Sequence, residues 1–372
     1  MNKIKILCVA GTRPEAIKMA PVIKALQKNA MFEVRVLATA QHRHLLDQVF
    51  NIFEIKYDYD LDVMTPNQTL PELTAKLMTG IDAVLENFKP DMVVAQGDTT
   101  TVLTAALAAF YRQIPFAHVE AGLRSNDLYS PFPEEGNRIL AGHLSTLHFA
   151  PTAMAKENLL REGISDEKII VTGNTVIDAL LQTAALDVDP GFTIPENARL
   201  VLVTSHRREN FGKPLINICN ALCTLINKYE DICVVFPVHP NPHVRDTVYG
   251  ILSENERIKL VNPLGYEQFV AAMKRSYLIL SDSGGVQEEA PALGKPVLVL
   301  RQETERMAAL AVGATKLAGT DEQNIVNEVS RLLDDKKAWD SMVVSSSPYG
   351  DGHASDIIVS ALVEFFKNRI SD

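Results

Sequence analysis

Charged side chains recur directly after short apolar runs, in positions where they could bind an anion and transfer protons. The turn GTRPE (11–15) follows the run KILCVA, and QGDTTT (96–101) follows MVVA. A guanidinium suits a phosphate or carboxylate, and a carboxylate can take up or release a proton. The second half has the same arrangement, with SHRREN (205–210) after LVLVT and SDSGG (281–285) after YLIL. These turns predict a site for a charged ligand that has a reacting centre.

The stretch SDSGGVQEEA (281–290) is typical of a glycine turn that opens a helix. Two glycines let backbone N–H groups approach an anion at a helix N-terminus. The same helix carries Glu288 and Glu289 in its first turns, near the expected anion. Since adjacent helical residues point about 100° apart, these two carboxylates are predicted to have different roles.

Both halves of the chain alternate apolar runs with helical segments, and the pattern that begins at the N-terminus restarts near residue 199. Continuous rather than alternating apolar strands indicate parallel sheets that are buried on both faces. Ligands of such α/β sheets bind beyond the carboxyl ends of the strands. We therefore predict two Rossmann-like domains whose polar turns face a central cleft.

The predicted domain boundaries follow from the irregular segment between the two halves. We expect an N-terminal domain at 1–174, a linker at 175–198 that contains prolines and a glycine, and a C-terminal domain at 199–354. A final helix at about 355–372 could pack back on the N-terminal domain.

Composition excludes several classes of protein. The chain has 372 residues, with 36 Lys and Arg against 46 Asp and Glu, a formal net charge of −10 that disfavours nucleic-acid and anionic-membrane surfaces. Its most continuous apolar stretch, VLTAALAAFY (102–111), is shorter than the ~20 residues of a membrane span. The four cysteines form no CxxC pair, and no secretory leader is recognisable. We expect reduced thiols and a cytoplasmic location.

Neither a metal nor a bound cofactor is expected. His239 and His243 have the spacing H-x3-H, but Pro240 and Pro242 exclude the helical geometry that would bring both to one ion. The chain also lacks GxGxxG, which argues against a tightly bound nicotinamide.

The motifs, in their order along the chain, resemble the non-hydrolysing UDP-N-acetylglucosamine 2-epimerases of bacteria. The resemblance covers essentially the whole chain and rests on GTRPEAIKMAP, AQHR, GDTTT, HVEAGLR, SPFPEE, TGNTVIDAL, HRREN, DSGGVQEEAPALGKPVLVLR and PYGDG. It implies a GT-B fold, usually as a homodimer, with UDP bound by the C-terminal domain. It also implies interconversion of UDP-GlcNAc and UDP-ManNAc for cell-envelope polysaccharides, through elimination of UDP to a 2-acetamidoglucal and its re-addition.

The resemblance assigns roles to individual residues of this chain. The catalytic positions are three carboxylates and one histidine: Asp98, Glu120, Glu134 and His206. The substrate-binding positions are Arg13, Lys18, Ser283, Gly284, Gly285, Glu289 and Arg306, with the serine and glycines on the diphosphate and Glu289 on the ribose. A second, activating molecule of UDP-GlcNAc would contact Gln41, Arg207 and His239.

The chain departs from the family pattern at several places, which include His44 and Asn67 near the expected activator site, and other function classes stay open. TERMA (304–308) stands where the family usually has TERPE, Gln96 replaces a histidine, and Ser205 replaces a small residue. A GT-B glycosyltransferase, a hydrolysing 2-epimerase and a non-catalytic UDP-sugar sensor are the alternatives.

Overall fold

The structure is a computed structural model that describes residues 3–39, 43–65, 67–344 and 347–371. The chain divides into two compact units, Met1–Ala179 with Tyr349–Asp372, and Leu180–Pro348. Helix α7 (Thr175–Ala184) runs from the first unit into the second. Within the described ranges, no helix is both long and apolar enough to cross a bilayer.

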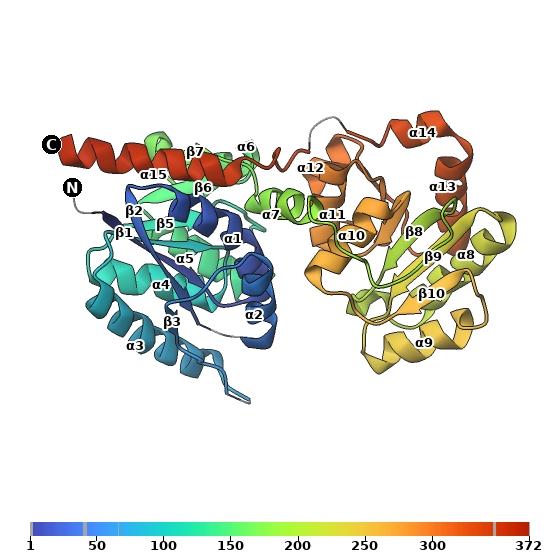
Figure 1. Ribbon diagram of the computed structural model, residues 1–372, viewed down its shortest axis with the longest axis horizontal. Coiled ribbons are helices and arrows are strands. Elements are labelled where there is room, and N and C mark those ends of the chain that lie inside the picture. The colour runs from blue at the N-terminus through green and yellow to red at the C-terminus, as the bar shows by residue number, and fades with distance from the viewer. Residues whose placement is uncertain (1–2, 40–42, 66, 345–346, 372) are drawn as a thin grey trace. The chain divides into compact units, whose positions relative to one another are not determined.

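The first unit is built on a seven-stranded parallel sheet of order β3-β2-β1-β4-β5-β6-β7 (Figure 1). Its strands are β1 (Ile4–Ala10), β2 (Phe32–Ala38), β3 (Tyr59–Asp60), β4 (Met92–Gln96), β5 (Phe116–Val119), β6 (Leu147–Ala150) and β7 (Ile169–Val171). Its other helices are α1 (Arg13–Lys28), α2 (Arg43–Ile52), α3 (Leu70–Phe88), α4 (Thr100–Tyr111), α5 (Glu134–Leu144), α6 (Ala153–Arg161), η1 (Asp166–Lys168) and α15 (Ala354–Ser371).

Helices pack in two groups in this unit. Helix α1 contacts α2 and α15, whereas α4 contacts α3 and α5. The C-terminal helix is held to the first unit partly by Phe366, whose ring meets the ring of Phe32 edge-on at 6.4 Å between centroids. The chain therefore returns to its first unit at its C-terminal end.

The second unit repeats the same topology with a six-stranded parallel sheet of order β10-β9-β8-β11-β12-β13. Its strands are β8 (Arg199–Thr204), β9 (Ile232–Pro237), β10 (Ile258–Val261), β11 (Leu278–Ser281), β12 (Val297–Val299) and β13 (Thr315–Leu317). Its helices are η2 (Arg208–Asn210), α8 (Lys213–Lys228), α9 (Pro242–Leu252), α10 (Tyr266–Arg275), α11 (Gly284–Glu289), η3 (Ala290–Leu293), α12 (Met307–Ala311), α13 (Glu322–Asp334) and α14 (Lys336–Asp340).

The central strands are buried on both faces, as their continuous apolar sequences predict. Every residue of β4 and β11 is buried, and so are the last five residues of β1. Burial of such runs supplies most of the driving force for each sheet. The prediction of an α/β fold with two parallel sheets is confirmed.

The strand order of each sheet reverses at one point, between β1 and β4 in the first unit and between β8 and β11 in the second. Such a reversal leaves a crevice at the carboxyl ends of the two strands, where α/β proteins bind ligands. The turns GTRPE and QGDTTT follow β1 and β4, and SHRREN and DSGG follow β8 and β11. The fold thus brings each pair of polar turns to the ligand-binding edge of its own sheet.

Candidate active site

A buried carboxylate joins the two polar turns of the first unit. Glu15 caps α1 together with Thr12, and its Oε2 accepts hydrogen bonds from the amides of Gly11 at 2.7 Å and Thr12 at 2.8 Å. Its Oε1 accepts the hydroxyl hydrogen of Thr99, in the turn after β4. Burial raises the pKa of Glu15, and the Thr99, Gly11 and Thr12 bonds oppose that shift. The contacts of Glu15 with Gly11 and Thr99 hold the turn that carries the half-buried Arg13.

The carboxylate of Asp98 lies in that second turn and is held by α5. Its Oδ2 is 2.8 Å from a guanidinium nitrogen of Arg138, and its backbone carbonyl accepts a 2.9 Å hydrogen bond from the side chain of Asn137. Burial raises the pKa of Asp98, while the positive charge of Arg138 lowers it. The side chain remains 29% exposed, so a substrate can reach it.

The carboxylate of Glu120, just after β5, faces the same cluster. Its Oε2 accepts hydrogen bonds from Lys18 Nζ and from Gln96 Nε2, both at 2.5 Å. The backbone of Glu120 is left-handed, with φ at 64°, which costs a residue with a side chain about 1–3 kcal/mol. The surrounding contacts hold this strained residue with its side chain only 9% exposed.

The third carboxylate, Glu134, opens α5 one helical turn before Arg138. Residues separated by four positions lie on the same face of a helix, so Glu134 and Arg138 face the same way. The negative charges of Glu120 and Glu134 raise the pKa of Asp98, and the charge of Lys18 lowers it. The first unit therefore gathers three carboxylates with two cations at the edge of its sheet, an arrangement suited to proton transfer.

A buried aspartate organises the candidate site of the second unit. Asp282 follows β11, is fully buried, and accepts hydrogen bonds from Ser205 Oγ at 3.0 Å and from the amides of His206 at 2.9 Å and Arg207 at 3.0 Å. The side-chain amide of Asn210 donates a further bond at 2.9 Å. Asp282 thus fixes the backbone of the turn after β8, and so fixes the positions of His206 and Arg207 in that turn.

The imidazole of His206 lies beside Asp282 in this turn. Its Nδ1 lies 3.3 Å from Asp282, and its ring stacks on that of His239 with centroids 6.2 Å apart. The side chain is 46% exposed, so one side of the ring is accessible. A histidine held this way can donate a proton or a hydrogen bond to an anion.

The glycine turn at the start of α11 lies against an arginine. A Cβ on Gly284 would stand 3.2 Å from the guanidinium of Arg306, and one on Gly285 would stand 3.4 Å from the carboxylate of Glu289. The guanidinium of Arg306 is in turn ion-paired with the buried Glu288 at 2.6 Å. The two adjacent glutamates therefore differ in placement. Glu288 pairs with Arg306, whereas Glu289 lies beside the glycine turn that begins at Ser283.

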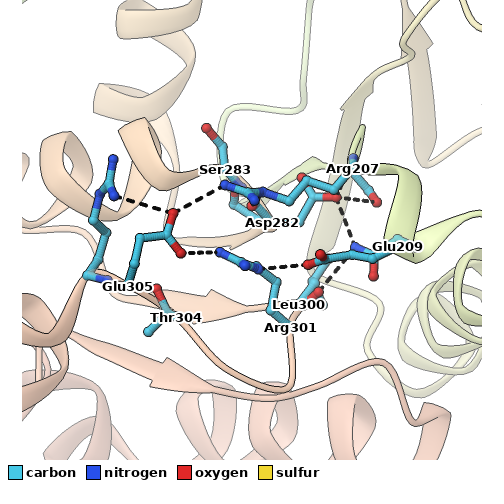
Figure 2. Close-up of polar contacts among 12 residues, drawn as sticks. Arg207, Glu209, Asp282, Ser283, Leu300, Arg301, Thr304 and Glu305 are labelled. Atoms are coloured by element: carbon cyan, nitrogen blue, oxygen red, sulfur yellow. Dashed lines mark hydrogen bonds and ion pairs between the residues drawn. The ribbon is translucent and has the colours of Figure 1, made fainter. Parts of the chain in front are cut away.

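A second carboxylate, Glu305, connects the arginines of this region (Figure 2). Its Oε1 lies 3.4 Å from Arg207 and 3.3 Å from Arg306, and its Oε2 lies 2.7 Å from Arg301. Arg301 also pairs with Glu209 at 2.8 Å. Partial burial raises the pKa of Glu305, but the hydrogen bond from its own amide and the charges of Arg301 and Arg306 lower it to about 2. Glu305 is therefore an anion at any physiological pH.

Gln41 lies outside the residues that the structure describes. Within the described part of the chain, no group of three or more His, Cys, Asp or Glu side chains has the geometry of a metal site.

The comparisons with known proteins agree with the geometry. The family model described as UDP-N-acetylglucosamine 2-epimerase matches residues 24–363. The UDP-N-acetylglucosamine 2-epimerase of Escherichia coli K12 is 50% identical over 379 residues, which cover 99% of this chain and 100% of that protein. The chain belongs to the UDP-N-acetylglucosamine 2-epimerase family. The family predicted from the motifs is thereby confirmed.

Solved structures of relatives extend this family assignment. The UDP-GlcNAc 2-epimerase from Neisseria meningitidis, solved with UDP-GlcNAc bound, is 49% identical with a TM-score of 0.85, over 97% of this chain and 100% of that one. MnaA from S. aureus, solved with UDP, is 47% identical with a TM-score of 0.86, over 99% of this chain and 98% of that one. MurG from Acinetobacter baumannii, 14% identical with a TM-score of 0.59, shares the fold alone. The GT-B fold class is confirmed.

The clusters also contain residues that the motif analysis missed. These are Glu15, Arg138, Asp282 and Glu305. The capping-box spacing T-x-x-E could have revealed Glu15. The other three sit beside predicted residues, but their roles depend on partners that only the fold identifies.

Proposed function

We propose that this chain interconverts UDP-GlcNAc and UDP-ManNAc by inverting C2, without net hydrolysis. The observation that carries the proposal is the cluster of Asp98, Glu120 and Glu134 in a member of the 2-epimerase family. Curated relatives at about half identity carry the name of this activity, and one relative was solved with UDP-GlcNAc bound.

The chemistry of C2 requires more than simple proton exchange. Its hydrogen is not next to a carbonyl and is poorly acidic. In the proposed route a carboxylate takes the C2 proton, the C1–O bond to UDP breaks, and a C1=C2 double bond forms. UDP then adds back to C1 while a carboxylic acid protonates C2 on the opposite face. No oxidant or reductant is needed, because every electron pair returns to the bond it left.

The three carboxylates would supply the acid and base groups. Asp98 and Glu120 each have a cationic partner, Arg138 at 2.8 Å and Lys18 at 2.5 Å, which holds the carboxylate in place. Arg13, which opens α1 at the edge of the same sheet, would add positive charge on the phosphate side. Elimination and re-addition would then use carboxylates at the edge of one sheet, two of which are held by ion pairs.

The second unit would bind the nucleotide. We assign the diphosphate to Ser283, Gly284 and Gly285 with Arg306, because the guanidinium lies against the glycine turn. Glu289 beside Gly285 would accept hydrogen bonds from the ribose diol. His206 would assist departure of the diphosphate, since its presented ring can donate to an anion.

A second UDP-GlcNAc is proposed to activate the enzyme through Gln41, Arg207 and His239. The stacked rings of His206 and His239 support this assignment, because the residue proposed for the activator and the residue proposed for catalysis are in contact. We further propose a homodimer that works in the cytoplasm, without metal or cofactor, and supplies cell-envelope polysaccharide synthesis. Retention of full activity in EDTA is the expected result for the metal.

Incubation with UDP-GlcNAc, followed by NMR of the products, tests the proposed function. We expect UDP-ManNAc and UDP-GlcNAc at equilibrium. Free ManNAc with UDP as the main products would indicate a hydrolysing epimerase instead. Transfer of the sugar to an acceptor without UDP-ManNAc would indicate a glycosyltransferase, and unchanged UDP-GlcNAc would indicate a sensor.

A further inference from the structure

Arg138 lies between two carboxylates, Asp98 and Glu135, and does not itself exchange a proton in the proposed route. Its side chain is only 13% exposed, and its guanidinium is 2.8 Å from Asp98 and 3.5 Å from Glu135. A guanidinium buried between two carboxylates is fixed in direction, because movement would leave buried charges unpaired.

Glu135 anchors the loop that leads to the third carboxylate. It is fully buried, and its carboxylate accepts hydrogen bonds from the amides of Ser125 at 3.0 Å and Asn126 at 3.1 Å. This contact ties the segment before α5 to the helix that begins with Glu134. Through Glu135, Arg138 is therefore attached to the loop that places Glu134.

Helix α5 contacts Asp98 at two points. Asn137 donates to the backbone carbonyl of Asp98, and Arg138 pairs with its carboxylate. Two contacts from one rigid helix determine both the position and the direction of the carboxylate.

We propose that Arg138 is a positioning residue that holds the carboxylate of Asp98 in its reactive orientation and ties it to the loop that carries Glu134. The inference rests on the proposed function, since it assigns Arg138 a part in the same reaction. Arg138 acts through Asp98 and does not itself exchange a proton.

The charges around Asp98 decide the direction of the expected pH effect. Burial raises the pKa of Asp98, Arg138 and Lys18 lower it, and Glu120 and Glu134 raise it. Glu15, on the neighbouring turn, adds a further negative charge when ionised.

Removing Arg138 takes away the largest charge effect that lowers this pKa. The Asp98 carboxyl should then lose its proton only at higher pH, so the acidic limb of the pH profile should move upward.

Arg138→Gln tests the proposal through the pH dependence of kcat/KM for UDP-GlcNAc. We expect the acidic limb to move to higher pH and kcat at neutral pH to fall by about 10- to 100-fold, as misplacement of a catalytic group does. Binding of UDP alone should stay unchanged. Arg138→Lys keeps the positive charge but lacks the planar guanidinium. Its acidic limb should lie close to that of the unmodified enzyme, and its kcat should stay below that of the unmodified enzyme.

Arg112→Gln is the matched control, since Arg112 pairs with Asp82 and Glu86 in the same unit, away from these carboxylates. It should leave the acidic limb in place. An Arg138→Gln enzyme whose acidic limb coincides with that of the unmodified enzyme would refute the proposal, whatever its rate. Should Arg138→Gln not fold, an unchanged kcat in Arg138→Lys would refute it equally.

A direct titration separates this inference from the proposed function. Carboxyl ¹³C NMR, with Asp98→Asn to assign the signal, follows the protonation of Asp98 without any turnover. Failure of the unmodified protein to epimerise UDP-GlcNAc would reject the proposed function alone. The inference would still predict that the Asp98 signal titrates at higher pH in Arg138→Gln, and an identical titration would reject it.

Discussion

The guanidinium of Arg306 is paired with the buried carboxylate of Glu288 at 2.6 Å, and this pair sets the arginine against Gly284. The pair explains why a carboxylate lies so close to a turn that suits phosphate. Glu288 acts on the arginine that would meet the anion, and its own charge is neutralised by that contact.

Glu288→Gln should therefore weaken UDP binding, because Arg306 loses the partner that directs it. We expect the dissociation constant for UDP to rise by roughly tenfold, the loss of about one charge-assisted hydrogen bond. Isothermal titration calorimetry measures the change. Glu328→Gln, which removes the ion pair with Lys316 elsewhere in the second unit, is the control and should bind UDP normally. Equal or tighter binding by Glu288→Gln would contradict the orienting role.

Asp98→Asn preserves the size of the side chain and removes the carboxylate that we propose transfers a proton. Turnover should fall by roughly 10²–10⁴-fold, while UDP binding should change little. Steady-state kinetics and UDP titration give the two quantities separately. A variant with near-normal turnover would remove Asp98 from the mechanism.

Two buried histidines on neighbouring strands should make the first unit sensitive to acid. His118 and His148 face each other in register on β5 and β6, and burial lowers their pKa values to about 4 and about 3. Both ring nitrogens of His148 lack a hydrogen-bond partner within the described structure. The unfolded chain binds these protons near pH 6.5, so stability is complete above that pH and falls as the pH drops toward 4.

His148→Leu should reduce this acid sensitivity, because one of the two buried groups no longer titrates. Thermal unfolding at about pH 7.5 and about pH 5.5 gives the comparison, and the drop in midpoint should be smaller in the variant. His353→Gln changes an exposed histidine and should keep the full drop. The explanation fails if His148→Leu loses as much stability in acid as the unmodified protein.

The proposed activator site predicts unusual kinetics in the reverse direction. Pure UDP-ManNAc should react with a lag or negligibly, and traces of UDP-GlcNAc should relieve the lag by binding the activating site. Arg207→Ala should weaken this relief more than it weakens UDP binding. Linear conversion of pure UDP-ManNAc from the first turnovers would exclude activation.

The continuous apolar strands made the fold predictable, because they indicate a parallel sheet and so place the following turns at one edge. The positions of Arg13 and Asp98 in their turns followed from this reasoning. The different directions of Glu288 and Glu289 followed from helix geometry alone.

The partners of these residues could not be predicted in the same way. Arg138 meets Asp98 only because α5 packs beside α4, and Arg306 meets Glu288 only because the chain returns after β12. The left-handed backbone of Glu120 is likewise set by tertiary contacts, since a local sequence preference would disfavour it.

Positional isotope exchange tests the central claim of elimination and re-addition most directly. UDP-GlcNAc labelled with ¹⁸O in the bond between C1 and the β-phosphate is incubated with the enzyme in D₂O, and the products are followed by NMR. If UDP is released and recaptured, the label must scramble among the oxygens of the β-phosphate, and UDP-ManNAc must carry deuterium at C2. Formation of UDP-ManNAc that keeps the substrate's own hydrogen at C2 and the label wholly in the bridge would contradict the account.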